Sequence, residues 1–202
     1  FTDAVAHSSR EARLSASLQH PSIIKIHTVF SLSPTTCFYV MPLLEGGTLR
    51  EVIHSGKRIP PRTLLSWLQT LVSALDCLNQ HHIVHLDIKP GNILFTGEGQ
   101  PVLADFGTAS LLPPHGSVNI LAHSAYSAPE LFTEDAAPDI RADQYSLAAC
   151  FYELMTSYPW NTMSGKVGEA HAGELLVSLA QNEKSLRCVS CLLVLIHYLK
   201  RE

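Results

Sequence analysis

Charged residues are scarce in this sequence. Lys, Arg, Asp and Glu make up 16% of its 202 residues, and the net charge at pH 7 is −4 with histidine neutral. No uninterrupted run of lysine and arginine is present, whereas proteins that bind nucleic acids through the phosphate backbone carry a strongly basic surface. The composition therefore argues against a general nucleic-acid binder.

Long hydrophobic runs are also lacking. The most apolar stretch, residues 191–199, is well short of the roughly 20 residues that a membrane-spanning helix needs. The first residues are polar and do not lead from a charged start into an apolar run, as a signal peptide would. We therefore expect no membrane contact and a location in the cytosol or nucleus, with the cytoplasm as the default.

Cysteine provides no disulfide framework. The five cysteines are odd in number and irregularly spaced, which is typical of a reduced, intracellular protein. Cys188 and Cys191 form one CxxC pair, but a structural zinc site takes four ligands, and His197 is the only other candidate in that tail. We interpret these thiols as packing groups of helices. What remains is an ordinary globular composition, 46% hydrophobic, sufficient for one domain with its own core.

The predicted elements place a small strand-bearing part before a larger helical part. Residues 4–18 favour a helix that ends at His20-Pro21, and residues 23–30 and 36–41 favour strands. Residues 43–47 are predicted to be a flexible connection, because two adjacent glycines interrupt the pattern. The later predicted elements are a short helix capped by Thr48 and ending at Ile53, a long helix between Pro60-Pro61 and His81-His82, strands at 93–95 and 102–104, an almost wholly apolar helix at 142–156, and two helices after about residue 169.

Three short motifs stand in order in the middle of the chain. They are HLDIKPGN at 85–92, Asp105-Phe106-Gly107 after a predicted strand, and Ala128-Pro129-Glu130. Taken singly, the Asp and Asn residues could be ordinary turn residues, since both types favour turns. Turns do not account for the three motifs occurring together, in this order and at this spacing.

Together these motifs resemble the catalytic loop, the metal-binding motif and the closing motif of the eukaryotic-type protein kinase family, serine/threonine type. The resemblance is good over about residues 8–160 and weak beyond. It implies an α+β, two-lobe fold that uses ATP and Mg²⁺. Residues 1–202 would then be a partial kinase domain, with 1–42 the remnant of a small, truncated, β-containing N-lobe and 43–202 a mainly helical C-lobe.

The resemblance also implies roles for four residues. Phosphoryl transfer requires positioning and charge neutralisation more than covalent chemistry. Asp87 would accept the hydrogen bond of the substrate hydroxyl and act as the base, and Lys89 would balance charge on the moving phosphoryl group. Asn92 and Asp105 would hold magnesium, a cation that prefers oxygen ligands.

Further matches concern the nucleotide site. Glu11 would be the glutamate that pairs with a nucleotide-binding lysine, although an exposed helix charge is the alternative interpretation. Met41 would screen the back of the adenine pocket. Pro42 would offer adenine only its carbonyl, which is compatible with a residue that lacks an N–H, and Leu44 would supply the N–H and a second carbonyl.

Other residues would support the catalytic loop. His85 and Phe106 would pack two loops against each other, and Asp143 would accept hydrogen bonds from the catalytic-loop backbone, since a buried carboxylate needs such partners. Ser124 would stand beside Asp87 in a substrate-docking loop, where the family usually has threonine.

The sequence departs from the family pattern in two informative places. No glycine-rich loop and no lysine precede Glu11, although both normally grip the nucleotide phosphates; the chain could be a fragment, or the protein could lack them. Leu86 replaces an arginine that usually reads a phosphate on the activation segment, and residues 105–130 contain no lysine or arginine. We therefore expect any activity to be independent of phosphorylation at Ser110 or Ser117.

Two functions compete. The first is ATP-dependent transfer of the γ-phosphoryl group to serine or threonine hydroxyls of protein substrates, supported by the presence of all four residues with chemical roles. The second is a non-catalytic kinase-like binding or scaffold module, supported by the missing N-terminal strands. Their absence would leave an unpaired strand edge at 23–41, which a partner or the missing segment should cover. We favour the kinase for the parent protein. We expect little or no activity from these 202 residues alone, because phosphoryl transfer is slow when ATP is not held in the right position.

Overall fold

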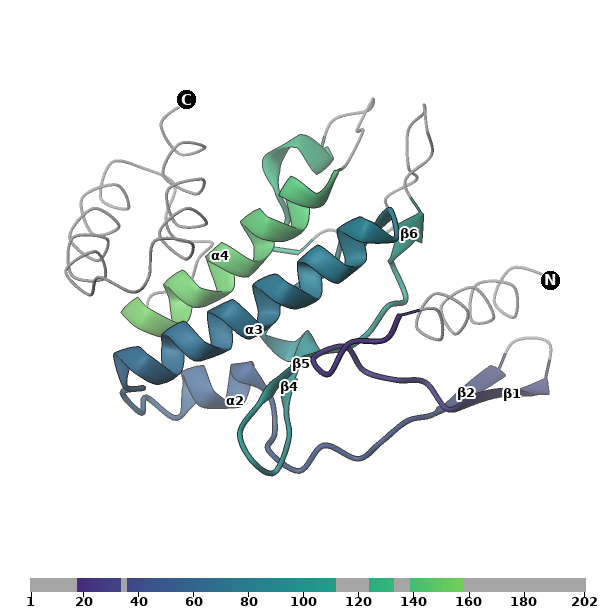
Figure 1. Ribbon diagram of the computed structural model, residues 1–202, viewed down its shortest axis with the longest axis horizontal. Coiled ribbons are helices and arrows are strands. Elements are labelled where there is room, and N and C mark those ends of the chain that lie inside the picture. Colours follow the sequence, from purple (N-terminus) through teal and green to yellow (C-terminus); the bar gives the residue numbers. More distant parts are fainter. Residues whose placement is uncertain (1–17, 34–35, 112–123, 133–138, 158–202) are drawn as a thin grey trace.

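Two long helices form the body of the molecule. The computed structural model describes residues 18–33, 36–111, 124–132 and 139–157. In this part, helix α3 (Pro61–Gln80) packs against helix α4 (Ile140–Thr156), and the short helix α2 (Leu49–His54) contacts α4 (Figure 1). Two predicted features lie outside the described residues: the helix at 4–18, apart from Leu18, and the helices after 169. Glu11, Ser117 and the CxxC pair lie outside them as well.

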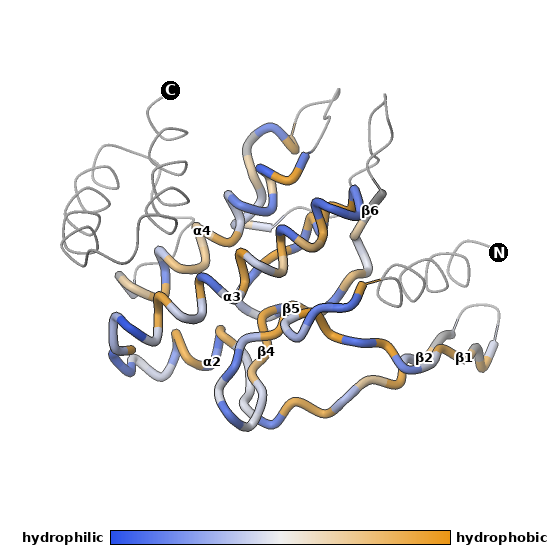
Figure 2. The backbone as a smooth tube through the Cα atoms, viewed as in Figure 1, coloured by the Kyte–Doolittle hydropathy of each residue, from blue (hydrophilic) through white to orange (hydrophobic). Residues whose placement is uncertain are grey.

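Helix α3 begins and ends where the sequence predicts. Pro61 occupies its first turn, a position where a missing N–H removes no helical hydrogen bond. Its buried residues recur at helical spacing and form one stripe, Leu68, Leu71, Ala74, Leu75 and Leu78. Hydrophobic and hydrophilic segments alternate along the tube of α3 in Figure 2. This stripe faces α4 and the strands, so burial of one apolar face fixes α3 in the core.

Helix α4 is buried along most of its length. Asp139 caps its start by accepting a hydrogen bond from Arg141 N–H at 2.8 Å, and Ser157 ends it in a left-handed conformation with φ 58°. Leu147, Ala149, Cys150 and Phe151 are among its buried residues, which confirms the central helix predicted at 142–156. No helix within the described ranges is both long enough and apolar enough to cross a membrane.

The first strand pair lies apart from the helices. Strands β1 (Thr28–Ser33) and β2 (Thr36–Val40) pair antiparallel, and within the described residues they form a two-stranded sheet of their own (Figure 1). The predicted strand at 23–30 is wrong in its start. Residues 22–24 instead pair with β5: Ile24 N–H donates to Leu103 O and Leu103 N–H donates to Ser22 O, both at 2.8 Å.

One face of this sheet is apolar and exposed. Phe30 and Phe38 stack with ring centroids 5.4 Å apart, and the exposed large hydrophobic residues there are Phe30, Leu32, Phe38 and Val40. The isoleucines just before β1 behave differently, because Ile23, Ile24 and Ile26 are buried. Burial of these side chains in the fold, rather than a place in β1, explains why this part of the run is apolar.

The connection after β2 is fixed to a second hairpin. Strands β4 (Ile93–Phe95) and β5 (Pro101–Leu103) pair antiparallel. Gly46 N–H donates to Phe95 O and Phe95 N–H donates to Gly47 O, both at 2.9 Å. A Cβ on Gly46 would lie 2.4 Å from Thr96 O, so this glycine permits close backbone approach. The expectation of a flexible connection at 43–47 is therefore corrected at Gly46 and Gly47.

The short helix that follows is capped as predicted. Thr48 Oγ1 accepts from Glu51 N–H at 3.2 Å, and Glu51 Oε2 accepts from Thr48 N–H at 3.0 Å. This reciprocal arrangement satisfies two backbone donors at the start of α2. Helix α2 is thereby set against the segment η1 (Pro90–Asn92), which belongs to the HLDIKPGN motif.

Candidate active site

The backbone of the HLDIKPGN motif is anchored by a buried carboxylate. The motif follows strand β3 (Ile83–Val84), which pairs with β6 (Ser110–Leu111). Asp143, from α4, accepts hydrogen bonds from His85 N–H at 2.7 Å and Leu86 N–H at 2.9 Å. Leu86 has φ 66°, a left-handed conformation that costs an ordinary residue about 1–2 kcal/mol. The prediction that Asp143 holds this backbone is confirmed, and its two bonds stabilise a strained turn.

Burial dominates the ionisation of Asp143. The side chain has no exposed surface, and burial raises its pKa from 3.8 to about 6, although the hydrogen bonds from His85 and Leu86 act in the opposite direction. The carboxylate is therefore mostly ionised at neutral pH. Its charge is available to accept both backbone hydrogen bonds at that pH.

His85 links the motif to the segment that carries Asp105. Its Nδ1 accepts from Asp87 N–H at 3.3 Å, so the proton resides on Nε2, which donates to Ala104 O at 3.2 Å. The ring also packs against Phe106, with centroids 4.7 Å apart. Burial lowers the pKa of His85 from 6.5 to about 4, so the imidazole is neutral at pH 7. The packing role predicted for His85 and Phe106 is confirmed.

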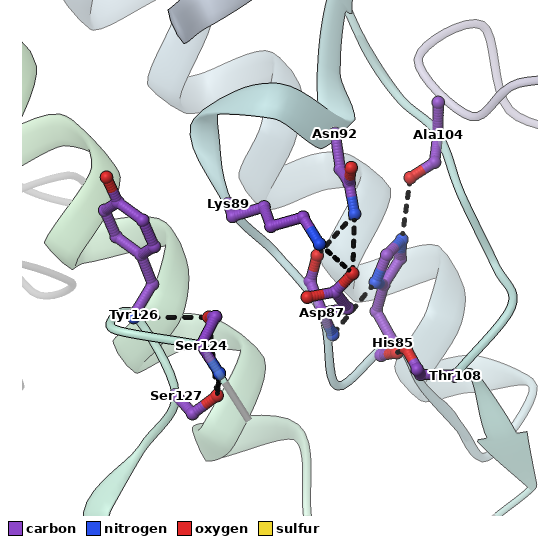
Figure 3. A network of polar contacts seen from close by, with 9 residues as sticks. All are labelled: His85, Asp87, Lys89, Asn92, Ala104, Thr108, Ser124, Tyr126 and Ser127. Carbon is purple, nitrogen blue, oxygen red and sulfur yellow. Dashed lines mark hydrogen bonds and ion pairs between the residues drawn. The ribbon is translucent and has the colours of Figure 1, made fainter. Parts of the chain in front are cut away.

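Lys89 and Asn92 both contact the same carboxylate oxygen of Asp87 (Figure 3). Lys89 Nζ lies 2.6 Å from Asp87 Oδ2, and Asn92 Nδ2 donates to the same oxygen and to Asp87 O, both at 2.9 Å. Asp87 and Asn92 are buried, which keeps their geometry fixed. These bonds leave Asp87 Oδ1 with no hydrogen bond to another described residue. Asp87 therefore has one oxygen held by the protein and one available to a substrate.

The donor set fits a hard cation. Because Asn92 uses its amide nitrogen toward Asp87, its Oδ1 is oriented away from these bonds and makes none to another described residue. Asp105 supplies an exposed carboxylate and lies close enough to His85 to influence that ring electrostatically. Amide and carboxylate oxygens are the ligands that Mg²⁺ prefers.

The residue that breaks the family pattern is buried in a small apolar cluster. Leu86 packs with Val84, Ala128, Leu131 and Ala142, all buried. Ala128 and Leu131 belong to the Ala128-Pro129-Glu130 region and Ala142 to α4. Hydrophobic contact therefore joins the HLDIKPGN motif to the Ala128-Pro129-Glu130 region.

The predicted adenine-binding residues lie on the segment between β2 and α2. Met41 is 41% exposed, whereas Leu44 is half-buried and packs against the main core. No backbone hydrogen bond joins Leu44 to another described residue, so its N–H and carbonyl are available there. Pro42 is exposed. The roles predicted for Met41, Pro42 and Leu44 stay predictions.

Ser124 belongs to a separate turn. Its Oγ accepts from Tyr126 N–H at 3.2 Å, and its own N–H donates to Ser127 Oγ at 2.8 Å. In Figure 3 this turn is drawn apart from Asp87, with no contact marked between the two. The expected place of Ser124 beside Asp87 thus stays a prediction.

Sequence reasoning missed two residues that hold this region together. Thr108 Oγ1 donates to His85 O at 3.0 Å, and Tyr126 OH donates to Glu153 Oε2 at 2.6 Å. Thr108 directly follows Asp105-Phe106-Gly107, so its position next to a motif was the available signal. Tyr126 and Glu153 are far apart in the sequence, and no local pattern indicates their contact.

Comparison with known families agrees with this geometry. The sequence model of the protein kinase domain matches residues 2–187. This chain belongs to the protein kinase family. The α+β kinase-like fold expected from the motifs is therefore its fold.

Several curated serine/threonine-protein kinases are similar to this kinase chain. A probable serine/threonine-protein kinase of Streptomyces coelicolor is 33% identical over 158 residues, which cover 74% of this chain and 23% of the relative. Serine/threonine-protein kinase PknB of Mycobacterium leprae is 32% identical over 158 residues, covering 74% and 25%. CBL-interacting serine/threonine-protein kinase 16 of Arabidopsis thaliana is 31% identical over 160 residues, covering 74% and 34%. The chain thus spans about a quarter to a third of these relatives.

Proposed function

We propose that this chain is part of a kinase that transfers the γ-phosphoryl group of ATP to serine or threonine hydroxyls of protein substrates. The observation that carries the proposal is the convergence of Lys89 Nζ and Asn92 Nδ2 on a single oxygen of the buried Asp87. This arrangement supports a carboxylate whose other oxygen receives a substrate hydroxyl. In this proposal residues 1–42 are the remnant of the N-lobe and residues 43–202 form the C-lobe.

Asp87 acts as the base in this mechanism. Oδ1 accepts the proton of the substrate hydroxyl while the hydroxyl oxygen bonds to the γ-phosphorus of ATP and the bond to the departing ADP breaks. Asn92 keeps the carboxylate oriented through Oδ2 and the backbone carbonyl. The ammonium group of Lys89, 2.6 Å from Asp87, is near enough to exchange that contact for the phosphoryl oxygens.

Asn92 and Asp105 would hold magnesium in the proposed complex. Mg²⁺ bound there would supply positive charge to neutralise the phosphate oxygens of ATP. Leu44 binds the adenine edge through its N–H and carbonyl, Pro42 offers its carbonyl, and Met41 screens the back of the pocket. Ser124 lies near the acceptor when substrate is bound.

Activity is expected to be independent of activation-segment phosphorylation. The position that usually carries a phosphate-reading arginine is Leu86, which packs against Ala128 and Leu131. A new phosphate would find no cation there. Ser110→Ala and Ser117→Ala should therefore retain activity in the full-length protein, and loss of activity in either variant would contradict this part of the proposal.

ATP binding and phosphoryl transfer, measured together, separate the proposed function from a binding module. We expect isothermal titration of ATP in Mg²⁺ to show binding that Asp105→Ala weakens and that EDTA removes. Gln19→Ala, at an exposed position, is a control that should bind ATP as the wild type does. Binding of ATP without phosphoryl transfer by the full-length protein would favour the kinase-like binding or scaffold module.

A further inference from the structure

Arg50 is an exposed cation that reaches the candidate catalytic loop from α2. Its guanidinium lies over Gly91, where an added Cβ would be 3.1 Å from Nη2 and 3.4 Å from Cζ. Gly91 stands in η1 between Pro90 and Asn92, and α2 packs against this segment. A larger residue at 91 would displace the guanidinium, so the glycine leaves the space that Arg50 occupies.

Arg50 forms no ion pair with another residue of the described part. The ion pairs found there join Lys89 to Asp87 and Arg141 to Asp139. The neighbouring Glu51 carboxylate is engaged in the cap of α2. The positive charge of Arg50 is therefore not paired with a carboxylate of the described part of the chain.

Basic residues are concentrated in the sequence from Arg50 onward, and we call Arg50, His54, Lys57, Arg58 and Arg62 together the basic strip. The seven lysines and arginines of the described residues are Lys25, Arg50, Lys57, Arg58, Arg62, Lys89 and Arg141, and four of them fall within residues 50–62. All five members of the strip are exposed. Glu51 is the one acidic residue in this range, although the whole chain has a net charge of −4.

We propose that the basic strip binds an acidic segment of the protein substrate, with Arg50 contacting a carboxylate close to the phosphorylated serine or threonine. This inference rests on the proposed function, because it places the acceptor at Asp87, four residues before Gly91. A guanidinium suits the planar geometry of a carboxylate. Charges at the edge of a binding site set partner preference and association rate more than total affinity.

The test compares two peptides that differ only in charge. Each has a central serine, with three glutamates on either side in one and three glutamines on either side in the other. For the full-length protein we expect kcat/KM to favour the glutamate peptide, and Arg50→Gln to reduce that ratio by about two- to fivefold, as for one exposed ion pair. Arg50→Glu should reduce the ratio of the two kcat/KM values further. This variant should also favour a third peptide, in which lysines replace the six glutamates. Raising the salt concentration should diminish the wild-type ratio.

Controls separate charge at this place from charge in general. Lys25→Gln removes an exposed cation outside the strip and should keep the wild-type ratio. Fluorescence anisotropy with a glutamate peptide carrying alanine in place of serine measures binding without catalysis, and Arg50→Gln should weaken it by a similar factor. Thermal melts establish that each variant is folded.

The possible outcomes distinguish this inference from the proposed function. If neither peptide is phosphorylated but the alanine peptide binds through Arg50, the proposed function fails and the acidic-binding surface stands. If both peptides are phosphorylated equally, or if Lys25→Gln lowers the ratio as much as Arg50→Gln does, the inference is overturned and the kinase proposal stands. Tighter, Arg50-dependent binding of a single-stranded oligonucleotide of equal charge would also overturn it.

Discussion

Replacement of His85 by glutamine should change how the stability of this protein depends on pH. His85 is fully buried, and burial lowers its pKa from 6.5 to about 4. Below pH 6.5 the unfolded chain therefore binds a proton that the folded protein does not bind until about pH 4. This group leaves stability unaffected above pH 6.5, and stability is lost as the pH falls through the window between the two values.

The expected magnitude follows from the two pKa values. The shift from 6.5 to about 4 corresponds to about 3 kcal/mol in total, and about 2 kcal/mol of this is lost between pH 7 and pH 5. Glutamine does not titrate. His85→Gln should be less stable than the wild type at pH 7, because the ring contact with Phe106 is lost, and the difference in free energy of unfolding should shrink by about 2 kcal/mol at pH 5.

Urea unfolding at pH 7, 6 and 5 measures this difference. The raised pKa of Asp143, about 6, acts with the opposite sign, since its folded form takes up a proton first and gains stability as the pH falls from 6 toward 3.8. That contribution is present in both proteins and cancels in the difference. Phe106→Leu is the packing control, and its curve should run parallel to the wild type. Parallel curves for His85→Gln as well would refute the argument.

Two further predictions concern stability alone. Gly46→Ala should lower the free energy of unfolding by about 1–3 kcal/mol, because its Cβ would lie 2.4 Å from the backbone oxygen of Thr96. Gly97→Ala, whose Cβ would meet only a side-chain oxygen at 3.8 Å, should change it by less than about 0.5 kcal/mol; equal losses in urea unfolding would contradict the assignment of close approach at Gly46. Tyr126→Phe should cost about 1–2 kcal/mol, since it removes the 2.6 Å hydrogen bond to Glu153, and an unchanged thermal midpoint would show that water replaces this bond.

The helices were predictable because their signals are local. The leucine stripe of α3 and the proline at its first turn determine that helix without reference to the rest of the chain. Thr48 and Glu51 form a cap within one turn. The sequence predicts too early a start for strand β1 because Ile23 and Ile24 are typical strand residues. Their pairing with Leu103 depends on a segment about eighty residues away.

The candidate site was predictable to the extent that its residues lie within one motif. Asp87, Lys89 and Asn92 are five positions apart at most, so a short loop brings them together. The burial of Asp143 and the contact between Arg50 and Gly91 depend on tertiary packing. No local pattern in the sequence carries that information. The concentration of basic residues within 50–62 is visible in the sequence, but the place of Arg50 beside Gly91 depends on how α2 packs against η1.

The central claim is tested most directly by following phosphate from γ-labelled ATP to a serine peptide. The assay compares the full-length protein with Asp87→Asn, a variant that keeps the size of the side chain and removes the base. We expect Mg²⁺-dependent transfer by the wild type and a loss of at least about a hundredfold in kcat for Asp87→Asn, with thermal stability little changed. Transfer at the wild-type rate by Asp87→Asn, or no transfer by a folded wild type that binds ATP, would contradict the account.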